Sequence, residues 1–287
     1  MGERPQIGVA VIQGRPFAEL RRDWMLCEEF GFHSLWVFDH LMTYPIMGVL
    51  LEAWTTLAAM AVCTERIRIG TNVTNITYRN PAVLAKEAIT VDHLSDGRLD
   101  LGIGAAGTRT EDVLVTGAEE WSVVERVERF GEFVELISDL TSGRTDRYDG
   151  RYYRSERFNR GPWPVQRKIP LTIAAHGPKT LAVAAKHADT WSASAGFNRG
   201  NPKLVEFLRD YNDRLDQMAA DLGRDPGTIR RSLTIGTSGF DWWRSRDAFD
   251  DFFGRVAEAG TSDLIFAYPP AADLDAETFL SLVKPLT

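Results

Sequence analysis

This sequence is short of cysteine, of positive charge and of long hydrophobic runs. Its two cysteines, Cys27 and Cys63, supply neither a disulfide framework nor the spacing of a metal site, so we expect no metal and a reducing, cytoplasmic location. The 33 basic residues are outnumbered by 40 acidic ones. The resulting net charge of −7 argues against nucleic acid or an anionic membrane as a partner.

The hydrophobic runs are also too short for a membrane segment. None reaches the roughly 18 residues of a spanning helix, and Met1–Gln13 is too short and too polar for a signal peptide. We therefore expect a soluble protein that acts on a small molecule. Of its 287 residues 44% are hydrophobic, and this length suits one α/β barrel over residues 1–287, since such a barrel needs about 250 residues.

Short runs rich in β-branched residues alternate about eight times with longer amphipathic stretches. The expected strands are Ile7–Ile12, Ser34–Phe38, Ile67–Val73, Leu99–Ile103, Pro170–Ala174, Thr190–Ala193, Arg230–Ile235 and Asp263–Tyr268. The expected helices are Phe17–Phe30, Leu51–Val62, Ala82–Leu94, Ser122–Leu140, Pro178–His187, Pro202–Leu222, Arg246–Ala259 and Ala276–Val283. Alternating elements imply parallel strands joined by right-handed crossovers, and eight such units predict a (β/α)8 TIM barrel.

One interval breaks this alternation. Gly143–Lys168, between the fourth and fifth strands, contains eight cationic and five aromatic residues. Such a composition can bind nucleic acid, but the acidity of the whole chain favours a surface β-excursion beside the barrel.

Two adjacent polar residues follow the second strand. Reacting groups of such barrels lie on the loops after the C-terminal ends of the strands. Asp39 and His40 directly follow Leu35–Phe38 and so stand at this mouth of the barrel. A carboxylate beside an imidazole suits proton transfer, because histidine titrates near neutral pH. The alternative is a helix-capping aspartate beside an incidental histidine, and position alone does not decide between the two.

Polar and glycine-rich stretches follow the third and fourth strands. Thr71–Asn75 can hydrogen-bond the edge of a planar ring, or it is an ordinary loop. Gly102–Gly107 matches the G-x-G-x-x-G pattern of dinucleotide sites, but it follows the fourth strand, and Thr108–Glu120 after it reads as polar and irregular. We therefore expect a wall of a cofactor site rather than a Rossmann fold, because glycine permits close backbone approach. The residues assigned to this wall are Gly104, Ala105, Ala106 and Gly107.

The fifth strand runs into a segment that opens a helix at Pro178. Backbone amides at a helix start, together with Lys179, predict a phosphate site. The alternative is an ordinary connection between a strand and a helix. The residues assigned to this site are Ala175, His176, Gly177, Pro178 and Lys179.

Three residues are assigned to a substrate pocket. Trp242 and Trp243 follow the seventh strand, where they either line an apolar pocket or pack under the next helix. Gln13 follows the first strand.

His93 and His187 end helices, where the helix dipole favours a protonated imidazole, and we expect both to be structural.

Together these motifs resemble the luciferase-like superfamily over nearly the whole chain. Asp92–Arg98 with Leu101–Gly104 is similar to a helix–turn–strand signature of that family, and Ile173–Pro178 with Ala188–Trp191 is similar to a second one. The third is Trp36–His40. Many flavin-using members have Glu-His there, whereas Asp-His resembles the branch that uses the deazaflavin coenzyme F420; the alternative cofactor is FMN.

The resemblance implies roles for these residues. Asp39 and His40 would contact the deazaflavin, with His40 as the acid/base or anion stabiliser, and Thr71, Asn72 and Val73 would support its ring through a non-proline cis peptide between Asn72 and Val73. The implied protein is a homodimeric oxidoreductase that transfers a hydride between F420 and a small organic substrate. A reduced-FMN-dependent monooxygenase and a non-catalytic flavin-binding barrel are the alternatives.

One departure from the family pattern bears on the substrate. The sugar-phosphate dehydrogenases carry a catalytic glutamate in the loop after the fourth strand, where this chain has Gly107 or Thr108. Oxidation of glucose 6-phosphate is therefore not expected.

Overall fold

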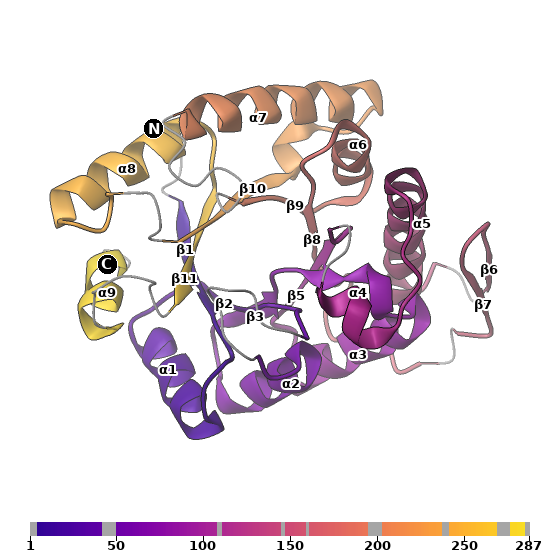
Figure 1. The fold of residues 1–287 in the computed structure, drawn as a ribbon, viewed down its shortest axis with the longest axis horizontal. Helices are drawn as coiled ribbons and strands as arrows, with labels where there is room; N and C mark the ends of the chain where they lie inside the picture. The colour runs from indigo at the N-terminus through magenta and orange to yellow at the C-terminus, as the bar shows by residue number, and fades with distance from the viewer. Residues whose placement is uncertain are drawn as a thin grey trace.

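The strands of the computed structural model close into one parallel barrel (Figure 1). The structure describes residues 5–41, 50–107, 111–144, 147–158, 161–194, 203–236, 241–268 and 276–284. In order around the barrel the strands are β1 (Gln6–Val11), β2 (Ser34–Val37), β3 (Arg68–Thr71), β5 (Leu99–Gly104), β8 (Leu171–Ala174), β9 (Thr190–Ser194), β10 (Arg230–Ile235) and β11 (Asp263–Tyr268), which pairs again with β1. The predicted (β/α)8 TIM barrel is confirmed.

A ring of helices surrounds the strands (Figure 1). Eight of them are α1 (Phe17–Glu29), α2 (Ala53–Cys63), α3 (Pro81–Leu94), α5 (Val123–Ser142), α6 (Pro178–His187), α7 (Leu204–Asp221), α8 (Arg246–Glu258) and α9 (Ala276–Val283). The short helix α4 (Glu111–Thr116) lies in the stretch that the sequence indicated to be irregular, so that expectation was wrong. The described residues also include two 3-10 turns, η1 (Ile76–Tyr78) and η3 (Pro226–Thr228).

Local sequence sets several of these helix starts. The Asn80 side chain accepts hydrogen bonds from the backbone N–H groups of Ala82 and Val83, and Pro81 occupies the first turn of α3. Ser122 caps α5 in the same way, and that helix ends at Gly143, whose φ of 70° is left-handed. Such caps satisfy backbone groups that have no partner within the helix.

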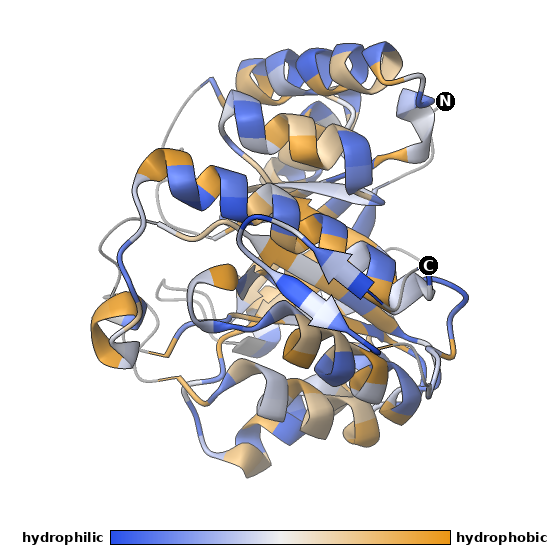
Figure 2. Cartoon of the chain, turned by 90° about the vertical axis from the view of Figure 1, so that its right-hand side faces the viewer, coloured by the Kyte–Doolittle hydropathy of each residue, from blue (hydrophilic) through white to orange (hydrophobic). Residues whose placement is uncertain are grey.

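The core has an outer and an inner part. The outer part fills the space between strands and helices with residues such as Leu35, Ile69 and Leu101, and Figure 2 shows apolar strands beneath helices of alternating polarity. The inner part lies inside the barrel and centres on Trp36. Gly70 leaves room for this ring, because a Cβ atom there would lie 2.6 Å from it.

The excursion after the fourth barrel strand is a two-stranded antiparallel sheet. It consists of β6 (Arg147–Asp149) and β7 (Arg154–Glu156) and lies outside the helix ring (Figure 1), as predicted. The Glu132 carboxylate of α5 accepts the backbone N–H groups of Tyr152 and Tyr153, which ties the hairpin to that helix.

No helix within the described residues has the length and apolar character needed to cross a membrane. Within the same residues, no three histidine, cysteine, aspartate or glutamate side chains converge as a metal site would require.

Candidate active site

His40 lies at the C-terminal mouth of the barrel, just past the end of β2. Its imidazole Nδ1 is 2.8 Å from Oδ2 of Asp112, which belongs to α4. Asp112 is 1% exposed, whereas the His40 side chain is 28% exposed. In the sequence the carboxylate beside this imidazole is that of Asp39. The ring contact that the structure describes comes instead from a residue 72 positions further along the chain.

Asp39 lies below the surface of the mouth and is 2% exposed. Its carboxylate accepts two hydrogen bonds from the Arg79 guanidinium, at 2.8 and 2.6 Å, and a third from the backbone N–H of Asn75 at 3.0 Å. The Tyr78 hydroxyl donates to the Asp39 carbonyl at 3.0 Å. Both the side chain and the main chain of Asp39 are thus held, which fixes the peptide that carries His40.

Arg79 connects this aspartate to two further acids. Its guanidinium is 2.8 Å from Oε1 of Glu52, the residue that caps α2, and 3.6 Å from Glu87 of α3. Burial alone would lower the pKa of Arg79, but the hydrogen bonds and charges of Asp39 and Glu52 raise it above its usual value. The guanidinium therefore stays charged.

The third barrel strand is interrupted by the predicted cis peptide. The bond between Asn72 and Val73 is cis, which confirms that expectation, and the strand resumes as β4 (Thr74–Asn75) beside β5. The Asn72 amide donates to the Thr234 hydroxyl of β10 at 2.7 Å, across the barrel interior. The Thr71 hydroxyl forms hydrogen bonds with the Thr74 hydroxyl and the Gly102 carbonyl. These bonds stabilise the irregular third strand.

The glycines of the fourth barrel strand make room for that interruption. A Cβ at Gly102 would lie 1.8 Å from the Thr71 carbonyl oxygen, and one at Gly104 would lie 2.5 Å from Val73. Strand packing therefore accounts for these two glycines. Ala105 is half-buried, Ala106 takes a left-handed φ of 58° and Gly107 is exposed, whereas Thr108 lies outside the described residues.

The segment after β8 is anchored by neighbouring elements. The Trp191 indole donates to the Ala175 carbonyl at 2.9 Å, and the Tyr211 hydroxyl donates to the His176 carbonyl at 2.6 Å. The His176 ring accepts the backbone N–H of Ser194 through Nε2 at 3.2 Å, and burial lowers its pKa. A neutral ring is consistent with this acceptor role.

The start of α6 faces the same mouth. Gly177 is its N-cap, and Pro178 and Lys179 are exposed in its first turn. Positive potential at the helix end and a lysine side chain suit a phosphate group.

Two of the residues predicted to contact substrate are buried. Trp242 is 3% exposed and packs within the outer core against four phenylalanine rings: Phe249, Phe252, Phe266 and Phe279. Gln13 is fully buried, and its amide bonds both the carbonyl and the N–H of Phe38. These two side chains stabilise the barrel, whereas Trp243 is half-buried beside the core.

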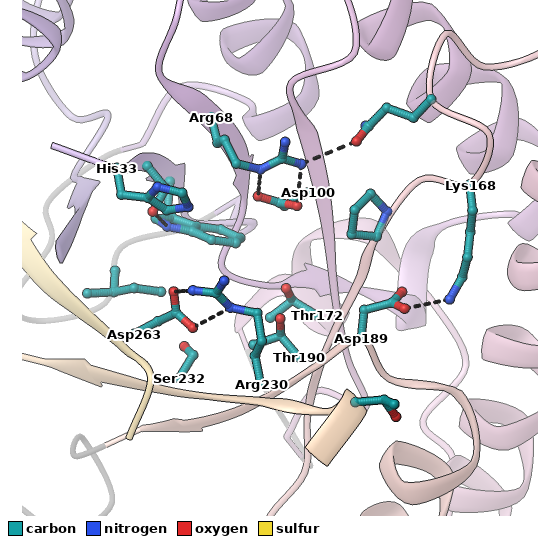
Figure 3. Close-up of a pocket in the computed structure, with 16 residues that line it drawn as sticks. His33, Arg68, Asp100, Lys168, Thr172, Asp189, Thr190, Arg230, Ser232 and Asp263 are labelled. Atoms are coloured by element: carbon teal, nitrogen blue, oxygen red, sulfur yellow. Dashed lines mark hydrogen bonds and ion pairs between the residues drawn. The ribbon is translucent and has the colours of Figure 1, made fainter. Parts of the chain in front are cut away.

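A cavity opens at the opposite, N-terminal end of the barrel (Figure 3). It has a volume of about 450 Å³ and is lined by the first residues of several strands. Figure 3 shows its charges as pairs, of Arg68 with Asp100 and of Lys168 with Asp189, each 2.6 Å apart, and of Arg230 with Asp263. The three pairs balance the charges of these six side chains at this end of the barrel.

His93 and His187, in the last turns of α3 and α6, lie away from the mouth. His93 Nε2 is 2.6 Å from the Trp163 carbonyl oxygen, which supports the structural role expected for it. Burial, reinforced by Lys186, lowers the pKa of His187 to about 4. A neutral ring corrects the expectation of a protonated imidazole at that helix end.

Sequence reasoning missed Asp112 and Arg79. Asp112 lies in the stretch read as irregular, and the only hint was the apolar run Val113–Val115 that follows it. Arg79 directly precedes the N-cap of α3, and nothing in that position indicates its partner.

A family model described as luciferase-like monooxygenase matches residues 4–240 of this chain. The F420-dependent glucose-6-phosphate dehydrogenase of Amycolatopsis mediterranei is 31% identical over 206 residues, which are 69% of this chain. The chain spans 60% of the length of that curated relative.

Two solved structures share the fold over almost the whole chain. An F420-dependent secondary alcohol dehydrogenase in complex with an F420–acetone adduct has a TM-score of 0.80 at 19% identity and covers 98% of both chains. The monooxygenase RslO1 from Streptomyces bottropensis has a TM-score of 0.76 at 20% identity, over 97% of this chain and 96% of its own.

Proposed function

Because the chain belongs to the luciferase-like monooxygenase family, we propose that it is an oxidoreductase that transfers a hydride between coenzyme F420 and a small organic substrate. The observation that carries this proposal is the position of Asp39 and His40 at the barrel mouth, with the ring of His40 held against a buried carboxylate. The F420-dependent glucose-6-phosphate dehydrogenase, 31% identical to this chain, supports the choice of cofactor.

The residues around the mouth fit a deazaflavin. The cis peptide at Asn72–Val73 would support the planar ring, and the start of α6 with Lys179 would bind the phosphate of the tail. Ala105, Ala106 and Gly107 are small and would form a wall. When bound, the coenzyme supplies the exchange of a hydride, which carries two electrons.

His40 would handle the proton that accompanies the hydride. When an alcohol is oxidised, the hydride leaves carbon and the hydroxyl proton passes to the imidazole; in the reduction the imidazole returns that proton to oxygen. The hydrogen bonds to the main chain and side chain of Asp39 fix the peptide that carries His40. The imidazole would therefore stay at the mouth during both the oxidation and the reduction. A positioned acid/base of this kind contributes about 10²–10⁴-fold to a rate.

A reduced-FMN-dependent monooxygenase is the second candidate. The fold shared with RslO1 favours it. A deazaflavin does not readily form an oxygen adduct, so dependence of turnover on oxygen separates the two functions. A non-catalytic flavin-binding barrel would bind a cofactor but show no turnover.

Cofactor titration tests the proposal. The apoprotein is titrated with F420 and, separately, with FMN while the cofactor fluorescence is followed. We expect F420 to bind with low-micromolar affinity or better, roughly −8 kcal/mol, and FMN to bind more weakly. The variant Lys179→Ala should weaken both cofactors, whereas Lys284→Ala, near the C-terminus, is the matched control. Tighter binding of FMN, with oxygen-dependent turnover, would favour the monooxygenase.

The same family resemblance supports a cytoplasmic homodimer. Light scattering after gel filtration should then give twice the 32.1 kDa of one chain. A mass of one chain at micromolar concentration would contradict the dimer without bearing on the reaction.

A further inference from the structure

We infer that Asp112 is a positioning residue that holds the imidazole of His40 in the orientation and tautomer needed for proton transfer, an inference that rests on the function proposed above. Neither the motifs nor the relatives pointed to this aspartate. It lies on α4, a helix outside the eight regular β/α units, at the edge of the mouth (Figure 1).

The contacts of Asp112 fix the carboxylate in place. Oδ2 is 2.8 Å from Nδ1 of His40, and Oδ1 accepts the backbone N–H of Leu41 at 2.7 Å. Both oxygens thus bind consecutive residues of one loop, and the side chain is 2% exposed. A carboxylate held at both oxygens cannot rotate without breaking a hydrogen bond, so it constrains the plane of the ring.

This arrangement also selects the tautomer. An ionised carboxylate only accepts hydrogen bonds, so the hydrogen between the two side chains must be carried by Nδ1 of His40. In the neutral ring Nε2 then carries the lone pair and is the basic atom. A buried carboxylate beside the ring also balances the charge that the imidazole gains with a proton, the logic of the aspartate in a serine-protease triad.

Asp39 cannot take this role, because its carboxylate accepts hydrogen bonds from Arg79 and from the backbone N–H of Asn75. The two aspartates therefore have different roles: Asp39 fixes the main chain that carries His40, and Asp112 fixes the ring. Displacement of α4 would release the ring, because the carboxylate that holds it belongs to that helix.

The isosteric variant Asp112→Asn tests the inference without needing a reaction. In this variant the amide oxygen can still accept the hydrogen bond from the backbone N–H of Leu41, and the NH₂ group then faces the His40 ring. Because the NH₂ group only donates, Nδ1 of His40 must accept its hydrogen bond. The neutral ring then carries its hydrogen on Nε2. We expect ¹⁵N NMR of histidine-labelled protein at alkaline pH to show Nδ1–H in the wild type and Nε2–H in the variant. His40→Gln identifies the signal among the five histidines.

Turnover gives the second readout. In an F420 assay Asp112→Asn should lower kcat by about 10²–10⁴-fold, as removal of the acid/base itself would, while the Kd for F420 changes less than about threefold. In a His40→Ala background the same substitution should have no further effect, because it acts through the ring. Leu114→Ala, at a 69% exposed position of the same helix, is the matched control and should leave kcat unchanged.

The outcomes separate the two proposals. A wild-type ring with its hydrogen on Nε2, or a variant ring that keeps Nδ1–H, would overturn the positioning role whatever the cofactor. The expected tautomers in a protein that does not bind F420 would support the positioning role and contradict the cofactor. If Asp112→Asn does not fold, as judged by circular dichroism, the wild-type tautomer alone decides.

Discussion

The guanidinium of Arg79 binds both carboxylate oxygens of Asp39, with Nε 2.8 Å from Oδ2 and Nη2 2.6 Å from Oδ1. The two side chains are 10% and 0% exposed, so the pair is buried directly beneath the residue that carries the imidazole. Removal of one partner from a buried pair leaves the other charge uncompensated. Asp39 therefore contributes to the stability of the mouth.

Asp39→Asn should lower the free energy of unfolding by about 3 kcal/mol. We place the effect at the low end of the usual range because Arg79 keeps Glu52 as a partner. Urea unfolding followed by tryptophan fluorescence measures it. The control Asp210→Asn breaks an exposed i,i+4 pair with Arg214 and should change stability by less than about 1 kcal/mol. Equal effects at the two sites would contradict the role of burial.

His40→Ala should lower turnover by about 10²–10⁴-fold while changing cofactor affinity far less, because a proton-transfer group acts mainly in the transition state. A screen of F420-dependent reactions must first supply a working substrate. The matched control is His93→Ala, which removes a histidine bound to the Trp163 carbonyl away from the mouth. Near-wild-type turnover of His40→Ala, with chemistry shown to be rate-limiting, would mean that the imidazole does not transfer the proton.

Gly102→Ala should lower the free energy of unfolding by at least about 3 kcal/mol, since the new methyl group would meet the Thr71 carbonyl oxygen at 1.8 Å. Gly131→Ala, within α5, meets only Val183 at an ordinary 3.6 Å and should stabilise the protein by about 0.5–1 kcal/mol. Thermal unfolding of both variants tests the pair. A tolerated alanine at position 102 would show that the two strands do not approach so closely.

The pH dependence of stability should report on His187. Its folded-state pKa of about 4 lies below the ordinary value of 6.5, so the unfolded chain binds the proton more tightly. The stabilisation from a neutral His187 is present above pH 6.5 and is lost as the pH falls toward 4. His187→Gln should therefore lose less stability than the wild type across this window, in urea titrations at several pH values. Parallel pH profiles would show that the ring protonates equally in both states.

The sequence predicted most of the fold because the signals for it are local. The limits of β10, β11, α6 and α9 were predicted to the residue, from β-branched runs, apolar periodicity and a proline at the start of one helix. The family resemblance was confirmed by the match over residues 4–240. It also gave the cis peptide between Asn72 and Val73, which no propensity indicates.

Several side-chain environments could not be predicted in this way. Trp242 follows a strand at the mouth, where a pocket and a packed core look alike in sequence, and only its four phenylalanine neighbours show that it is core. Gln13 follows β1 as a polar residue at the mouth would, yet its amide forms hydrogen bonds with the backbone of Phe38. Polarity and position limit a side chain's possible roles, but its partners select one.

The eight β/α units, their closure into a barrel and the position of Asp39 and His40 at its mouth could all be predicted from local patterns, because periodicity and strand direction are properties of neighbouring residues. The groups that hold these two residues became visible in the folded chain. Arg79 and Asp112 lie 40 and 72 positions beyond their partners. They reach Asp39 and His40 because barrel closure brings the loops after the second, third and fourth strands to one rim, and a contact between loops so far apart in the chain leaves no local pattern.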